Sequence, residues 1–177
     1  MQGKLVRLRA YEKSDADALF RWFSDEEVTQ WLGPPAFRSR AHQEEFIELA
    51  QASSDDAKYF AIETLDGKLV GDCGLRFIDW KSRKAEFFIT IGEKQFWGKG
   101  LGTDALRTVI RLAFDKMNLN RLWLSVLVDN PRAVRCYEKC GFVREGLMRQ
   151  ESYVDGKYRD VLMMALLREE YDRTRGA

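Results

Sequence analysis

The feature that most constrains the fold of this chain is a glycine-rich turn between a strand and a helix. Residues 85–91 read A-E-F-F-I-T-I, a β-prone run that predicts a strand, and residues 101–117 carry apolar side chains at helical spacing. Between them stands Trp97-Gly98-Lys99-Gly100-Leu101-Gly102. Glycines at alternate positions leave backbone N–H groups unobstructed at the start of a helix, where the dipole favours a phosphate or pyrophosphate. The spacing matches neither the G-x-x-x-x-G-K-[S/T] loop nor the G-x-G-x-x-G turn, and a plain structural turn remains the alternative.

The rest of the chain predicts an α+β protein, with a mixed, mostly antiparallel central sheet flanked by helices, in one domain over residues 1–177. Helices are expected at 14–23, 25–32, 39–50, 101–117 and 131–140, and strands at 4–9, 59–64, 69–77, 85–91, 121–128, 149–154 and 158–166. Ser14 is expected to cap the first helix, and Gly33-Pro34-Pro35 to end the second. Asp66-Gly67 and Asp155-Gly156 predict hairpin turns.

Composition and charge exclude several classes of protein. The 29 Lys and Arg residues nearly balance 28 Asp and Glu residues, which argues against a general nucleic-acid binder. No run approaches the roughly 18 apolar residues of a membrane-spanning helix, and residues 1–10 lack the apolar core of a signal peptide. With three cysteines and one histidine, we expect neither a disulfide framework nor a zinc site. The sequence therefore predicts a reduced, metal-free, cytoplasmic protein without a nucleic-acid or membrane partner.

A second motif lies downstream, in D-N-P-R-A-V-R-C-Y-E-K-C-G-F, residues 129–142. Asn130 is placed to cap a helix, and Tyr137 lies two turns further on the same helical face. A phenol held there could donate a proton to a leaving group. The alternative interpretation makes Tyr137 a half-buried packing residue.

Together, the two motifs resemble the GNAT superfamily of acetyl-CoA-dependent N-acetyltransferases. The order of predicted elements agrees with that fold from Leu5 to Leu167. The segments L-V-R-L-R-A near the start and Y-V-D-G-K-Y-R-D-V-L-M-M near the end are similar to the branch that contains ribosomal-protein and spermidine N-acetyltransferases. The resemblance implies acetyl-CoA as co-substrate and a homodimer as the quaternary state.

The resemblance also implies a set of cofactor-binding residues. The backbone of Ile89, Thr90 and Ile91 is expected to pair with the pantetheine arm as an added strand does. The expected pyrophosphate ligands are the amides of Trp97, Gly98, Lys99, Gly100, Leu101, Gly102 and Thr103. Asn130 is expected to contact the cofactor, and Tyr137 to protonate the departing thiolate of coenzyme A. The family often has Gln or Arg where Trp97 stands, a departure that matters little if the backbone binds the phosphates.

The reaction needs a neutral amine, so a group must accept the amine's proton directly or through water. Glu86, at the start of the strand expected to hold the cofactor, is the candidate base, and an exposed strand carboxylate is the alternative. A backbone N–H of the same strand is expected to stabilise the oxyanion. Cys136 and Cys140, one helical turn apart, are expected to be packing residues and not acyl-carrying thiols.

The acceptor site is expected between the N-terminal helices and the 149–160 hairpin. Residues 1–66 hold 8 Lys and Arg against 13 Asp and Glu, and the clusters Asp25-Glu26-Glu27 and Glu44-Glu45 are candidates for binding a cation. Tyr153 and Tyr158 are expected to wall the site or to pack within the hairpin. We expect direct transfer in a ternary complex to a small cationic amine such as a polyamine. A peptide N-terminus, an aminoglycoside-type amine, and a module that binds acetyl-CoA without turnover are the alternatives.

Overall fold

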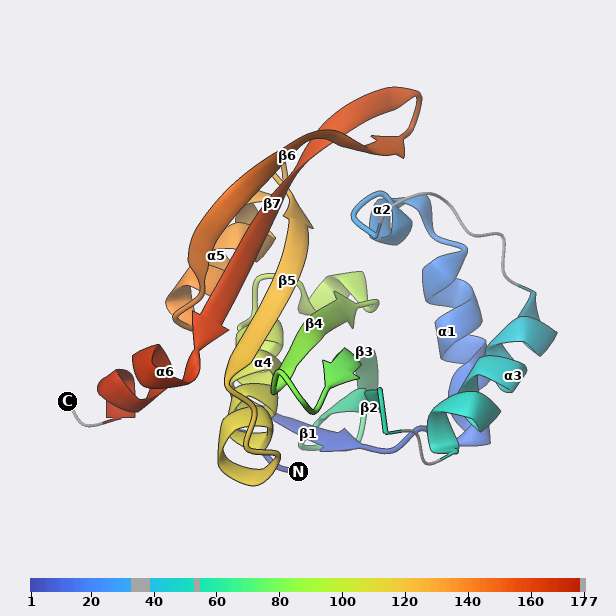
Figure 1. The fold of residues 1–177 in the computed structure, drawn as a ribbon. Helices are drawn as coiled ribbons and strands as arrows, with labels where there is room; N and C mark the ends of the chain where they lie inside the picture. The colour runs from blue at the N-terminus through green and yellow to red at the C-terminus, as the bar shows by residue number, and fades with distance from the viewer. Residues whose placement is uncertain (33–38, 53–54, 176–177) are drawn as a thin grey trace.

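The computed structural model describes residues 1–32, 39–52 and 55–175, and the expected helix stop at Gly33-Pro34-Pro35 lies outside them. Within these residues, seven strands form one sheet in the order β1-β2-β3-β4-β5-β7-β6 (Figure 1). The strands are β1 Val6–Arg9, β2 Lys58–Thr64, β3 Leu69–Asp79, β4 Lys84–Ile91, β5 Arg121–Leu127, β6 Val143–Val154 and β7 Lys157–Leu167. All described strand pairs are antiparallel except β4 with β5. The expected fold class is confirmed.

The helices lie on both sides of this sheet (Figure 1). They are α1 Ala16–Phe23, α2 Glu26–Thr29, α3 Arg40–Gln51, α4 Leu101–Arg111, α5 Pro131–Lys139 and α6 Arg168–Arg175, with short 3₁₀ turns at Lys13–Asp15 and Lys94–Phe96. The apolar stripe of α4 packs with α5 and the sheet in one core. Helices α1 to α3 form a second core around Leu19, Trp22 and Ile47. The two cores lie on either side of the strands that hold the site.

The sheet divides between β4 and β5. These two parallel strands are paired at Lys84–Arg121, Ala85–Leu122 and Glu86–Trp123, and the pairing ends there. Beyond Glu86 no described strand pairs with that edge of β4, whereas β3 remains paired with the other edge as far as Ile91. The backbone of residues 87–91 is therefore open on one side, as strand addition requires.

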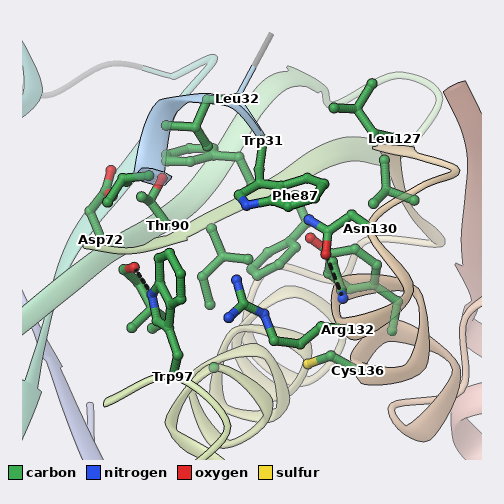
Figure 2. A pocket seen from close by; sticks show the side chains of 18 of the residues that line it. Trp31, Leu32, Asp72, Phe87, Thr90, Trp97, Leu127, Asn130, Arg132 and Cys136 are labelled. Atoms are coloured by element: carbon green, nitrogen blue, oxygen red, sulfur yellow. Dashed lines mark hydrogen bonds between the residues drawn. The ribbon is translucent and has the colours of Figure 1, made fainter. Parts of the chain in front are cut away.

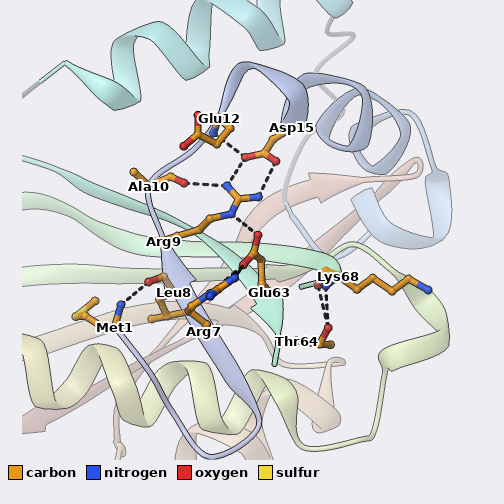
Figure 3. A network of polar contacts seen from close by, with 10 residues as sticks. All are labelled: Met1, Arg7, Leu8, Arg9, Ala10, Glu12, Asp15, Glu63, Thr64 and Lys68. Carbon is orange, nitrogen blue, oxygen red and sulfur yellow. Dashed lines mark hydrogen bonds and ion pairs between the residues drawn. The ribbon is translucent and has the colours of Figure 1, made fainter. Parts of the chain in front are cut away.

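The start of the first helix differs from the prediction. Ser14 lies inside the 3₁₀ turn Lys13–Asp15, and α1 begins at Ala16. The carboxylate of Asp15 accepts the backbone N–H of Glu12 at 2.8 Å and makes two bonds with the guanidinium of Arg9, at 2.7 and 2.8 Å (Figure 3). Ser14 is therefore wrong as the N-cap, because the buried carboxylate of Asp15 satisfies the start of the helix and a neighbouring cation together.

One further helix and one further strand have boundaries that differ from the prediction. The helix expected to Met117 is α-helical to Arg111 and continues as one π turn, Leu112–Lys116. The strand expected at 149–154 already begins at Val143, and its register with β7 is irregular between Met148 and Ser152. Within that irregularity Gln150 has a φ of 55°, and its N–H donates to the side chain of Asp160 at 2.8 Å. Sequence reasoning missed residues 143–148, V-R-E-G-L-M, because two adjacent charged residues and a glycine interrupt the alternation typical of a strand.

Candidate active site

A cleft of about 810 Å³ lies where β4 and β5 part, within the range of small-molecule sites (Figure 2). It is lined by residues from β3, β4, the glycine turn, α4, α5 and the N-terminal helices. Every catalytic or cofactor-binding residue predicted from the sequence lines this cleft except Lys99, whose ammonium group lies over the ring of Phe96 at 5.4 Å. The tertiary structure thus brings together residues that the sequence spreads over more than fifty positions.

The glycine turn has the geometry of an anion site. Gly98 and Gly100 have φ angles of 74° and 83°, in the left-handed region that other residues adopt only with strain. Gly100 is the N-cap of α4, so the first N–H groups of an eleven-residue helix face the cleft. Position 102 does not require a glycine, because a Cβ added there would lie 3.6–4.0 Å from the side chains of Ile89 and Ile91, at ordinary contact distance.

Helix α5 begins at the opposite wall of the cleft. The side-chain oxygen of Asn130 accepts the backbone N–H of Ala133 at 3.1 Å, which confirms the predicted N-cap (Figure 2). This bond fixes the start of α5 and with it the position of Tyr137, two turns later.

Tyr137 is buried and lines the cleft. Its ring packs edge-on against Phe87, with 6.5 Å between centroids, and no group in the described ranges hydrogen-bonds its hydroxyl. Burial raises the pKa of Tyr137 well above its ordinary value, and the neighbouring thiols of Cys136 and Cys140 raise it further. The phenol therefore stays protonated through neutral and moderately alkaline pH, as a proton donor must.

Glu86 is buried, so its interpretation as an exposed strand carboxylate is wrong. It stands at the last paired position of β4 and β5, directly across from Arg76 on β3. The Nε of Arg76 donates to its Oε2 at 2.5 Å. Sequence reasoning missed Arg76, although an arginine between the apolar residues Leu75 and Phe77 of a strand is a usable signal for an acidic partner.

The expected acceptor carboxylates do not line the cleft. Asp25 caps α2 and pairs with Lys94 at 2.7 Å, and Lys94 also contacts Glu27. Glu44 pairs with Arg40 on the exposed face of α3. Asp25, Glu27 and Glu44 thus form surface ion pairs outside the cleft, and the role expected for the acidic clusters in acceptor binding stays a prediction.

A different set of residues lines the part of the cleft formed by β3 and β4. Asp72 and Glu86 are the carboxylates that line it within the described residues, and both are buried. The hydroxyl of Tyr11 donates to Asp72 Oδ2 at 3.0 Å. The wall around them is aromatic, formed by Phe23, Trp31, Phe46, Tyr59, Phe87 and Phe88. Sequence reasoning missed Asp72, whose place in a buried strand could have indicated it.

Tyr153 and Tyr158 pack together at the tip of the β6–β7 hairpin, with 5.0 Å between ring centroids. Their side chains are 55% and 67% exposed, and neither lines the cleft, whereas Ser152 does. The packing interpretation of these two tyrosines is therefore the one the fold supports.

The two cysteines of α5 lie against the start of α4. Cys136 Sγ is 3.2 Å from the hydroxyl oxygen of Thr103, and Cys140 Sγ lies 3.9 Å from the carbonyl oxygen of the same residue. The hydrogen bond from Cys140 lowers the pKa of Cys136 to about 7, against the effect of burial. Both thiols pack against the main core, as expected from the sequence, and Cys136 also lines the cleft.

The described ranges contain neither a cluster of metal-binding side chains nor a helix suited to cross a membrane. No three histidine, cysteine or acidic side chains come together there as a metal site would need. None of the helices in those ranges is long and apolar enough to cross a membrane.

Comparison with known proteins assigns the family. The model of the acetyltransferase (GNAT) domain matches residues 6–143. The chain belongs to the GNAT acetyltransferase family. It is an acetyl-CoA-dependent N-acetyltransferase, and the expected resemblance, fold and enzyme class are confirmed.

Relatives of this GNAT protein fall in the expected branch. It is 30% identical over 166 residues to spermidine N(1)-acetyltransferase of Vibrio cholerae, covering 94% of this chain and 95% of that one. It is 37% identical over 107 residues to the putative ribosomal N-acetyltransferase YdaF of Bacillus subtilis, covering 60% and 58% of the two chains. A crystal structure of the Vibrio cholerae spermidine N-acetyltransferase with CoA and spermine superposes with a TM-score of 0.87 at 29% identity, covering 94% of this chain and 98% of that one.

The residues present fit acetyl-CoA, the acyl donor of this GNAT family. The open edge of β4 can take an extended amide-containing arm, and the glycine turn offers N–H groups to a pyrophosphate. Acetyl-CoA supplies an acetyl group activated as a thioester. What remains for the protein is to hold the acceptor, to take its proton and to protonate the leaving sulfur.

Proposed function

We propose that this protein acetylates a primary amine of a polyamine by direct transfer from acetyl-CoA in a ternary complex. The observation that carries the proposal is the pair of buried carboxylates, Asp72 and Glu86, in a cleft whose wall is aromatic. Carboxylates attract the ammonium groups of such an acceptor, and aromatic rings bind both ammonium groups and methylene chains. The spermidine acetyltransferase relative and its spermine-bound structure support the same acceptor class.

The spacing of the two carboxylates suits an elongated polycation. Asp72 pairs with Thr90, and Glu86 pairs with Arg76, so both acidic side chains stand on one face of the sheet. Four residues of strand separate the two positions, a span of about 13 Å. An acceptor with ammonium groups at both ends can therefore contact both carboxylates, whereas a compact monoamine contacts one.

Each catalytic side chain has a separate task in this proposal. Glu86 accepts the proton of the attacking amine, directly or through water, and Tyr137 gives its phenolic proton to the departing sulfur. Ile89, Thr90 and Ile91 hold the pantetheine arm, the amides from Trp97 to Thr103 bind the pyrophosphate, and Asn130 lies beside the cofactor at the start of α5. A backbone N–H of β4 stabilises the oxyanion.

Mass-detected acetyl transfer tests the proposal. The panel contains spermidine, spermine, an aminoglycoside, amino acids and peptides with free N-termini, each offered with acetyl-CoA. Transfer to polyamines with a kcat/KM well above that for the other amines is the expected result. Transfer confined to peptides supports N-terminal protein acetylation, the activity suggested by the ribosomal relative's name, and refutes the polyamine proposal. Acetyl-CoA binding without transfer to any amine supports a binding module instead.

The proposal includes a cytoplasmic location and a dimer. The described cysteines are free thiols, which suits a reducing compartment. Val143 and Leu147 on the edge strand β6 are 51% and 54% exposed, and a second copy would cover them. Light scattering of the purified protein measures the dimer, and fractionation of the source cells measures the location.

A further inference from the structure

Trp97 and Arg132 meet across the cofactor cleft. The guanidinium carbon of Arg132 lies 4.2 Å from the centroid of the Trp97 indole, and both side chains line the cleft (Figure 2). Trp97 follows the 3₁₀ turn after β4, and Arg132 stands in the first turn of α5, after β5. The contact therefore joins the two walls that separate where the sheet divides.

Arg132 stands where a cation is poorly placed for the protein alone. The N-terminus of a helix carries the positive end of its dipole, and the first turn of α5 has no acidic residue. No carboxylate within residues 1–32, 39–52 and 55–175 lies at ion-pair distance from Arg132, whereas Arg76 and Lys94, two cations near the same cleft, each contact one. An exposed guanidinium at this end of a helix, without an acid to neutralise it, is suited to an anionic ligand.

Trp97 is held in a fixed orientation. Its indole Nε1–H donates to the carbonyl oxygen of Ile91 at 2.6 Å, which ties the ring to the end of β4. A planar guanidinium that stacks on an aromatic face keeps its N–H donors in the plane, directed away from the ring. The stacked Arg132 can therefore bind a phosphate without leaving Trp97.

We propose that Trp97 and Arg132 form a clasp at the phosphate end of the acetyl-CoA site, in which Trp97 orients the guanidinium and Arg132 binds a phosphate of the cofactor. Arg132 then acts from the α5 wall, opposite the N–H groups of the glycine turn at the start of α4. The side chain of Trp97 thus has a role beyond the backbone contact expected of it. This inference rests on the cofactor of the family and is independent of the acceptor.

Calorimetric titration of the full chain with CoA, dephospho-CoA and pantetheine tests the clasp. We expect Arg132→Ala to weaken CoA binding by about tenfold or more, since a charge-assisted bond is lost. Pantetheine, which has no phosphate, should bind both proteins equally. A loss that disappears with dephospho-CoA assigns the guanidinium to the 3′-phosphate, and a loss that persists assigns it to the pyrophosphate. Unchanged CoA affinity in Arg132→Ala, or an equal loss for pantetheine, overturns the proposal.

Further variants distinguish the effect of stacking Arg132 on Trp97 from the effect of the charge of Arg132. Arg132→Lys keeps the charge but not the planar stack, and we expect it to recover part of the affinity. Trp97→Leu should weaken CoA binding, and adding Arg132→Ala to it should produce little further loss, because the two residues act as one unit. Trp97→Phe keeps a ring for stacking should the leucine variant fail to fold. Arg173→Ala, on the exposed surface of α6, removes the same charge far from the cleft and should bind CoA as the unaltered protein does. Additive losses from Trp97 and Arg132 would contradict the clasp.

Discussion

Arg76 and Glu86 face each other across β3 and β4, and the guanidinium of Arg76 holds the carboxylate proposed to accept the amine's proton. The carboxylate is buried, while the side chain of Arg76 is 45% exposed and lies over the rings of Phe77 and Phe88. A buried carboxylate needs a cation, and Arg76 provides it before the acceptor arrives. The ammonium group of an acceptor must then either share Glu86 with Arg76 or displace Arg76 from it.

Removing the resident cation should favour the acceptor. We expect Arg76→Gln to lower the KM for spermidine severalfold, because Glu86 becomes free to bind the ammonium group. Steady-state kinetics over a range of acceptor concentrations measure the change, and calorimetry should find CoA affinity unaltered. A KM that rises in this variant would mean that Arg76 helps to bind the acceptor.

Replacing the phenol of Tyr137 should remove the proton donor and leave the fold intact. We expect Tyr137→Phe to lower kcat by about 10²–10⁴ with little change in CoA affinity or melting temperature. Burial raises the pKa of Tyr137, so the activity of the unaltered protein should not fall between pH 7 and 9 through loss of this proton. Tyr158→Phe, at the exposed hairpin tip, is the matched control and should be fully active. Near-normal kcat in Tyr137→Phe would exclude the phenol as the acid.

The glycine turn offers a matched pair of substitutions. Gly100→Ala puts a side chain at a φ of 83° and should destabilise the fold by about 1–2 kcal/mol and weaken CoA binding. Gly102→Ala has room for its Cβ and should alter unfolding free energy by less than about 0.5 kcal/mol. Denaturant unfolding of both variants measures the difference. Equal destabilisation would show that the left-handed conformation at Gly100 is not what requires a glycine.

Cys136 should be the reactive thiol of the protein. The hydrogen bond from Cys140 lowers the pKa of Cys136 to about 7, whereas burial raises the pKa of Cys73 well above its usual value. Alkylation by iodoacetamide, followed by mass spectrometry, should rise through a midpoint of about pH 7 at Cys136, as the thiolate forms, and should spare Cys73. Bound CoA should protect Cys136, which lines the cleft. Cys140→Ala should move the midpoint to higher pH, and an unchanged midpoint would refute the hydrogen bond as its cause.

The buried network near the N-terminus should govern acid stability (Figure 3). Burial alone would raise the pKa of Glu63, but the guanidinium groups of Arg9 and Arg7 hold it below its ordinary value. The stabilisation is therefore present above the unfolded pKa of about 4.3 and is lost as pH falls through the lower folded value. Glu63→Gln should lose about 2 kcal/mol at pH 7 and show a flatter pH dependence below pH 5. Parallel curves for the two proteins in denaturant unfolding between pH 3 and 7 would contradict this.

Patterns among neighbouring residues predicted the helices and strands and most of the residues expected to bind the cofactor. Glycine at a left-handed φ, Asn130 as an N-cap and the apolar stripe of α4 depend on a few neighbouring residues, so the sequence alone reveals them. Ser14 failed as a cap because the carboxylate of Asp15 bonds the backbone of Glu12 and the guanidinium of Arg9, a pairing across the end of β1 that helix-capping patterns do not include.

The charged residues of the site could be identified only from the tertiary structure. The acidic clusters near Asp25 and Glu44 are visible in the sequence and form ion pairs on the surface, while Asp72 and Glu86, which belong to no acidic cluster in the sequence, are buried in the cleft. Whether a carboxylate lies on the surface or in a cleft is a property of long-range packing. The sequence thus determined the element types, the glycine turn and the helix that carries Tyr137. The tertiary structure decided which carboxylates are buried in the cleft and which cation pairs with each, because burial and ion pairing depend on distance in space and not along the chain.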